Sequence, residues 1–196
     1  MKKTKKLFLT LVSIALVVCT IVSMSSISVC AYSLTTGKGI SGRPLTIYAK
    51  SGLSSTYINA LQSSISTWNN AGYGTFFTYG GTKTATNLNE QDGVSVLSTI
   101  NLPGNTAFGV TTIWYNTSTK YIFEADISIN TAYSYFVSLA GTGYDLISVM
   151  THELGHALGL ADCTDTEATM YGYMNPQETK KRTLATDDLN GLNALY

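Results

Sequence analysis

Two stretches of the chain repeat apolar residues at the three- and four-residue spacing of an amphipathic helix. The first covers residues 54–71, and the second covers residues 145–159, where Asp145 or Thr142 is suited to cap the helix. A last helix is expected to begin at Thr186, whose two following aspartates suit the positive end of a helix dipole. The pattern therefore predicts three helices, two of them with an apolar face to bury.

Short runs rich in β-branched and aromatic residues lie between the first two helices, separated by Gly, Asn and Thr clusters, and one such run precedes them. These runs, which are typical of strands, cover residues 44–50, 75–79, 94–100, 107–115 and 121–129. Residues 32–43, rich in Gly and Ser, are expected to form a loose leader, and residues 160–185 a loop. This order of elements predicts an α/β (α+β) domain with helices packed against one sheet.

The beginning of the chain has the three parts of a secretory signal. Lysines precede an apolar run over residues 7–22, and Val29-Cys30-Ala31 places small residues where a signal peptidase would cut after Ala31. An uncleaved membrane anchor is the alternative, but the run is short for a span of about 20 residues, and hydroxyl side chains interrupt it. We expect residues 1–31 to be a signal peptide and residues 32–196 to be a secreted domain, with no stable membrane association.

Removal of this segment changes the charge and the cysteine content. Eight basic and twelve acidic residues remain, a net charge of −4, and no basic stripe is present that would bind nucleic acid. Of three cysteines only Cys163 remains, so no internal disulfide can form. The fold therefore depends on its core and on any bound metal.

Both histidines of the chain lie in the segment His152-Glu153-Leu154-Gly155-His156. Residues four apart project from one face of a helix, so both imidazoles can bind one metal ion. Gly159 allows a sharp turn that can return Asp162 as a third ligand. Three protein ligands and an open fourth position are typical of a catalytic zinc site, with Glu153 as the base that takes a proton from water. Two helix histidines satisfied by hydrogen bonds are the alternative, which their spacing around a glutamate disfavours.

The segment from His152 to Asp162 resembles the signature of the metzincin zinc proteases, in particular the matrixin branch. Residues 168–171, Ala-Thr-Met-Tyr, resemble the Met-turn of that clan, which would assign Met170 to it. Residues 124–130 and 182–196 resemble the strand before the active-site helix and the C-terminal helix. The resemblance implies a metzincin-like zincin: a twisted mixed sheet of about five strands, packed by a long N-terminal helix and the active-site helix, with a C-terminal helix.

The third ligand is where the sequence departs from the usual matrixin pattern. Typical matrixins have histidine there, and Asp162 instead resembles the smaller snapalysin-like metzincins. The neighbouring Cys163 is an alternative thiolate donor, although its spacing is one residue too long for the motif. Met174 is likewise an alternative to Met170. Because no further histidine exists, we expect no second, structural zinc.

Two further pairs of residues have open roles. Glu124 and Asp126 share one strand face, and the resemblance to matrixins implies a Ca²⁺ site there, whereas a solvated acidic face is the alternative. Tyr171 and Tyr173 follow the Met-turn, where relatives build the wall of the pocket for the residue after the scissile bond. Ordinary packing is the alternative for both tyrosines.

These features together predict a secreted zinc-dependent endopeptidase that acts as a monomer on protein or peptide substrates. An extended peptide is expected to bind along the strand at 107–115, which the resemblance places at the sheet edge. A zinc amidase that acts on cell-wall peptides and an inactive metzincin-fold binding module are the competing hypotheses. Retention of Glu153 argues against the inactive module, because a site kept only for binding needs no base.

Overall fold

A computed structural model describes residues 32–84 and 90–196 of the chain. The expected signal peptide, residues 1–31, lies outside the described residues. Among the helices of the described part, none is both long and apolar enough to cross a membrane.

The core of the fold is a five-stranded sheet with the strand order β3-β2-β4-β6-β5. Its strands are β2 (Leu45–Lys50), β3 (Phe77–Lys83), β4 (Ser95–Ile100), β5 (Gly109–Tyr115) and β6 (Ile122–Asn130). All neighbouring strands are parallel except β5, which pairs antiparallel with β6 from Gly109 opposite Ile129 onwards. The predicted mixed sheet of five strands is therefore confirmed, with β5 at one edge.

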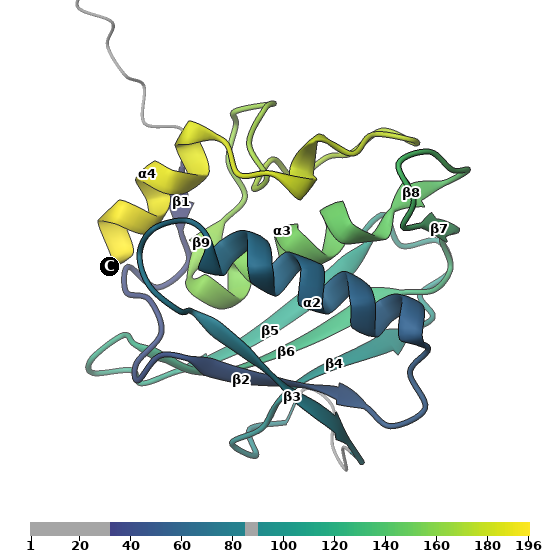
Figure 1. Cartoon of the computed structure of the whole chain (residues 1–196). Helices are drawn as coiled ribbons and strands as arrows, with labels where there is room; N and C mark the ends of the chain where they lie inside the picture. The colour runs from purple at the N-terminus through teal and green to yellow at the C-terminus, as the bar shows by residue number, and fades with distance from the viewer. Residues whose placement is uncertain (1–31, 85–89) are drawn as a thin grey trace, which may run out of the picture. The chain divides into compact units, whose positions relative to one another are not determined.

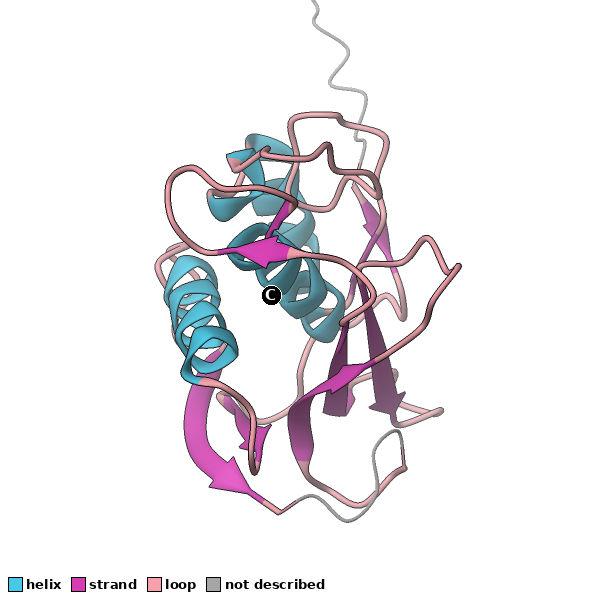
Figure 2. Cartoon of the chain, turned by 90° about the vertical axis from the view of Figure 1, so that its right-hand side faces the viewer, coloured by secondary structure: helices cyan, strands magenta, loops and turns pink. Residues whose placement is uncertain are grey.

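Two helices, α2 (Ser55–Asn69) and α3 (Leu146–Leu158), cover one face of this sheet (Figure 1). Figure 2 shows these helices in cyan above the strands. The apolar stripe of α2 buries Leu61, Ile65 and Trp68, and the indole Nε1 of Trp68 donates a hydrogen bond to the carbonyl of Thr151 on α3, 2.8 Å away. This bond satisfies the one polar atom of a fully buried tryptophan, and it fixes α2 against α3.

The segment at 32–43 is not the loose leader that its composition suggests. Strand β1 (Ser33–Leu34) pairs antiparallel with β9 (Leu160–Ala161), and Ile40 is buried in the core. The backbone N–H of Ile40 also donates a hydrogen bond to the hydroxyl oxygen of Tyr196, 2.8 Å away. The apolar side chains of Leu34 and Ile40 pack against the core, and this packing fixes the segment in place.

The stretch predicted as a loop, 160–185, contains β9 and the short 3₁₀ helix η2 (Lys180–Arg182). Ahead of α3, β7 (Tyr135–Phe136) and β8 (Tyr144–Asp145) form another two-stranded sheet, in which the strands are parallel. Helix α4 (Thr186–Leu195) follows, as expected. Two-residue strands and single helical turns lack a detectable period, so the sequence pattern could not show them.

Candidate metal centre

Helix α3 presents the two histidines on one face. Its first turn is capped by Asp145, whose Oδ2 accepts a hydrogen bond from the backbone N–H of Ser148 at 3.0 Å. The rings of His152 and His156 lie one turn apart, with their centroids separated by 4.7 Å. The helix ends at Gly159, whose φ of 103° is in the left-handed region that glycine adopts without strain.

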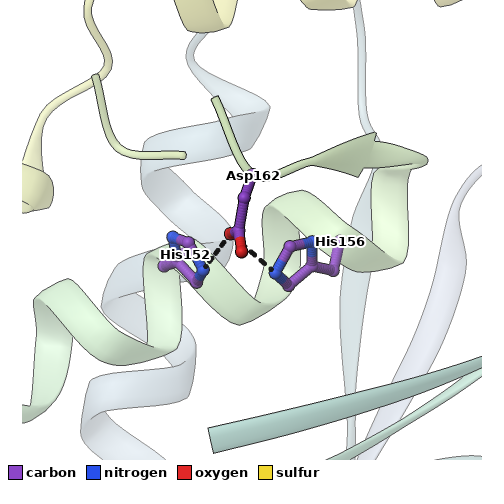
Figure 3. Close-up of side chains that lie close together, drawn as sticks. All are labelled: His152, His156 and Asp162. Carbon is purple, nitrogen blue, oxygen red and sulfur yellow. Dashed lines mark ion pairs between the residues drawn. The ribbon is translucent and has the colours of Figure 1, made fainter. Parts of the chain in front are cut away.

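This turn brings Asp162 back over the two imidazoles, as Figure 3 shows. Its Oδ1 lies 3.2 Å from Nε2 of His152 and 3.6 Å from Nε2 of His156. Among the described residues, these three side chains form the one group of potential metal ligands, with donor atoms within 4.8 Å of one another. The three residues predicted from their spacing are therefore close together in space.

The Nδ1 atom of each imidazole, on the side away from Asp162, already has a hydrogen-bond partner in the backbone. Nδ1 of His152 lies 2.8 Å from the carbonyl oxygen of Thr169, and Nδ1 of His156 lies 2.9 Å from that of Leu160. A carbonyl only accepts, so each Nδ1 carries the proton and each Nε2 keeps a lone pair directed towards Asp162. Burial lowers the pKa of His156, and His152 lowers it further, which favours the neutral, metal-binding imidazole. Two such nitrogens with one carboxylate fit zinc.

The carboxylate of Glu153 is held by the edge strand β5. It is 5% exposed, and Thr111 donates its hydroxyl hydrogen bond to Oε2 at 2.6 Å. A Cβ atom at Gly109 would lie 2.6 Å from Oε1, so any larger residue there would displace the carboxylate. Sequence reasoning missed both contacts, because Thr111 and Glu153 are 42 residues apart and no motif joins them.

Met170 lies beneath the histidine-bearing turn of α3. It is buried, and its sulfur occupies the space that a side chain at Gly155 would need. Met174, the alternative, lines the cavity beside the site instead. Asp188 of α4 fixes this turn, since its carboxylate accepts hydrogen bonds from the backbone N–H groups of Thr169 and Met170 at 2.9 and 3.0 Å. The sequence predicted Asp188 only as an acid at a helix start.

Cys163, the alternative third donor, lies outside the group formed by the two histidines and Asp162. It is buried, and its Sγ lies 3.8 Å from the carbonyl oxygen of Asp165. Burial raises the pKa of this thiol to about 11, which disfavours the thiolate that binds metal.

A cavity of about 570 Å³ adjoins the centre, and Glu153, both histidines and Asp162 all line it. Its remaining lining includes Ser148, Val149, Tyr173, Met174 and Lys181. Of the two tyrosines predicted as a pocket wall, Tyr173 lines the cavity, whereas Tyr171 is not among its lining residues and packs its ring 5.6 Å from that of Tyr173.

Glu124 and Asp126 are both buried, so the alternative of a solvated acidic face is wrong. The two oxygens of Glu124 accept hydrogen bonds from the backbone N–H groups of Asp92 and Gly93, and Asp126 accepts one from Val96. The pair tethers the segment that leads into β4. Calcium at this pair stays a prediction.

Two imidazoles and a carboxylate that converge beside a second, buried carboxylate are the set of side chains that a mononuclear hydrolytic metal site requires. A family model described as matrixin matches residues 66–196, two thirds of the chain. The chain therefore belongs to the matrixin family, and its domain is of the metzincin type found in zinc metalloproteases.

Individual relatives match over a shorter stretch. Metalloendoproteinase 1 of Glycine max is 46% identical over 55 residues, which are 28% of this chain and 18% of that protein. Neutrophil collagenase of Homo sapiens is 43% identical over 53 residues, 27% of this chain and 11% of that protein. The aligned part thus spans less than a fifth of these relatives.

One solved structure shows a distant likeness. High choriolytic enzyme 1, a hatching enzyme zinc-protease from Oryzias latipes, matches with a TM-score of 0.40 and 13% identity, over 84% of this chain and 93% of that chain.

Proposed function

We propose that the chain is a secreted zinc-dependent endopeptidase in which His152, His156 and Asp162 hold the metal and Glu153 is the general base. The observation that carries this proposal is the convergence of both Nε2 atoms on Oδ1 of Asp162, with each Nδ1 fixed by a backbone carbonyl. Glu153 lines the same cavity, so a base and the ligands act on one bound molecule.

Zinc bound at this centre would supply a Lewis acid that polarises a carbonyl oxygen and makes water a stronger acid. The residues of the chain do the remaining work. Thr111 donates to Oε2 of Glu153, which leaves Oε1 to take the proton of the attacking water. Because the carboxylate is almost fully buried and held by one directional hydrogen bond, it is oriented before substrate binds.

The edge strand β5 supports a peptide as substrate. Among the described strands β5 pairs only with β6, and Gly109, Val110 and Thr111 line the cavity beside Glu153. A substrate in extended conformation would add to this edge through backbone hydrogen bonds and carry its scissile carbonyl to the centre. We propose that the side chain after the scissile bond enters the cavity and contacts the wall that Tyr173 and Met174 form.

Digestion of a complex peptide library with residues 32–196, read by mass spectrometry, tests the activity. We expect zinc-dependent cleavage inside peptides that a chelator abolishes, and none with Glu153→Ala. Cleavage of peptidoglycan fragments alone would favour the zinc amidase, and binding without cleavage of either would favour the inactive module.

Secretion is tested separately. We expect the protein recovered from a culture supernatant to begin at Tyr32 when its N-terminus is sequenced. A membrane-retained product that still carries Met1 would show that the anchor alternative is right.

A further inference from the structure

Lys181 is a buried basic residue beside the metal centre for which sequence reasoning gave no role. It lies in η2, is 3% exposed and lines the cavity. Its Nζ donates a hydrogen bond to the carbonyl oxygen of Tyr171 and lies 5.8 Å from the centroid of the Tyr171 ring. The ammonium is therefore placed by the turn that follows Met170.

The charge of Lys181 is not neutralised by an ion pair. Its neighbour Lys180 pairs with Glu167 and Glu178 at 3.3 Å each, and Arg182 pairs with Asp145. Within the described residues, no carboxylate oxygen lies within the 4.0 Å of an ion pair with Lys181. An ammonium group has three N–H donors, and buried charges are costly unless they are paired. The Tyr171 carbonyl accepts from one of these donors, so the group can still donate to a further acceptor.

The rest of this cavity wall offers few competing partners. Val149 and Met174 are apolar, and the hydroxyl of Ser148 already donates to Oδ2 of Asp145 at 2.6 Å. Glu153 and Asp162 also line the cavity, but the proposed function gives them to the base and the metal. A substrate side chain that enters the cavity beside Val149 and Met174 therefore meets apolar surface, and Lys181 is the one lysine or arginine among the described residues of the lining.

We propose that Lys181 is a specificity-determining residue whose ammonium donates to a side-chain oxygen of the residue after the scissile bond, so that the enzyme cleaves before Glu or Gln in preference to Leu. This proposal rests on the proposed function. Glu and Gln match Leu approximately in length and add an acceptor oxygen at the end. A hydrogen bond to a charged group in a desolvated site favours the acceptor-bearing side chain by about ten-fold or more.

The test uses three peptides that differ only in Glu, Gln or Leu after the scissile bond. We expect the zinc-loaded enzyme to cleave the Glu and Gln peptides with kcat/KM at least about ten-fold above the Leu peptide. In Lys181→Met both ratios should fall to about one or below, because the apolar side chain offers no donor. Lys180→Met is the matched control, since Lys180 does not line the cavity, and it should keep the wild-type ratios.

Binding provides a second readout that needs no turnover. In a Glu153→Ala background, fluorescence anisotropy with the same peptides should give the same order of affinities, and Lys181→Met should remove it. Far-UV circular dichroism checks that each variant folds. If Lys181→Met fails to fold, Lys181→Arg, which keeps a cationic donor, should retain the preference for Glu and Gln.

The outcomes separate this inference from the proposed function. Equal or better cleavage of the Leu peptide by the wild type would overturn the role of Lys181, as would unchanged ratios in a folded Lys181→Met. Failure of the zinc-loaded wild type to cleave any peptide would instead overturn the proposed function, while the binding order would still decide the role of Lys181.

Discussion

Two groups of side chains for which the sequence predicts metal binding have different surroundings in the structure. His152, His156 and Asp162 have their donor atoms directed at one another, because backbone carbonyls occupy only the far nitrogen of each imidazole. The carboxylates of Glu124 and Asp126 instead accept backbone N–H groups from the segment at 92–96. Residue spacing identifies which side chains share a face, but the partners of those side chains decide whether they can bind an ion.

Exposure separates the two groups in the same way. The side chain of Asp162 is 62% exposed, whereas Glu124 is fully buried. Each oxygen of the buried Glu124 carboxylate already accepts a backbone amide, and turning this carboxylate towards a metal would weaken those bonds, so in this structure it acts as a structural tether. The exposed carboxylate of Asp162, which lies beside the Nε2 atoms of two imidazoles, would break fewer hydrogen bonds to protein groups on binding a metal.

The largest effect should come from a residue that lies at the metal centre without being a ligand. We expect Glu153→Ala to lower kcat/KM by about 10²-fold to 10⁴-fold or more, because it removes the proposed base, while zinc content stays at the wild-type level. Peptide cleavage rates and metal analysis of the same preparation check both parts. Retention of more than about a tenth of the wild-type activity would contradict the assigned role.

The next effect concerns the third ligand. Asp162→Ala should weaken zinc binding by at least about 100-fold, or about 2.7 kcal/mol, because one of the three proposed protein ligands is lost. Cys163→Ser is the matched control, since its thiol points to the carbonyl of Asp165, and it should change zinc affinity little. Zinc content after dialysis against a graded chelator series measures both variants. The ligand assignment fails if Cys163→Ser strips the metal and Asp162→Ala does not.

A smaller effect is expected in the other group. Glu124→Gln replaces one of the two oxygens that accept backbone amides, so it should lower the free energy of unfolding by about 1.5–3 kcal/mol. Urea unfolding should show the same loss with zinc and with chelator, and zinc content should not change. A stabilisation by Ca²⁺ that disappears in Glu124→Gln would instead show that the calcium prediction is right.

The sequence predicted the large elements of the fold well. The expected helix at 145–159 is α3 (Leu146–Leu158), and the expected strand at 107–115 is the edge strand β5 (Gly109–Tyr115). Each element is long enough for the spacing of its apolar residues to identify it as a helix or a strand. Strands β1 and β9 hold two residues each, so their pairing follows from tertiary contacts and left no pattern in the sequence.

The same distinction applies to the site. The sequence predicted that His152, His156 and Asp162 lie close together, because one helix and the turn after it connect them within eleven residues. Over so short a distance, residue spacing predicts proximity. Asp188 supports the turn at Met170 from 18 residues away, and Thr111 reaches Glu153 across 42. Such contacts depend on how the sheet, α3 and α4 pack, so only the structure reveals them.

The smallest effect should come from Thr111, which acts through Glu153 and touches neither metal nor substrate carbonyl in the proposed reaction. Thr111→Val keeps the shape of the side chain and removes the donor to Oε2, so the carboxylate loses its one directional restraint from β5. We expect kcat to fall by about ten-fold with KM nearly unchanged, since a hydrogen bond to a charged group is worth about 1.5–3 kcal/mol and rotation of the carboxylate recovers part of it.

Thr111→Ser separates positioning from packing, because it restores the hydroxyl without the methyl group. It should recover most of the lost kcat, although it packs less well than valine against α3. Steady-state kinetics on one peptide and zinc content of all three proteins are the measurements. If Thr111→Ser is as impaired as Thr111→Val, the methyl group matters more than the hydrogen bond. In that case β5 contributes to the centre through the space that Gly109 leaves for the carboxylate.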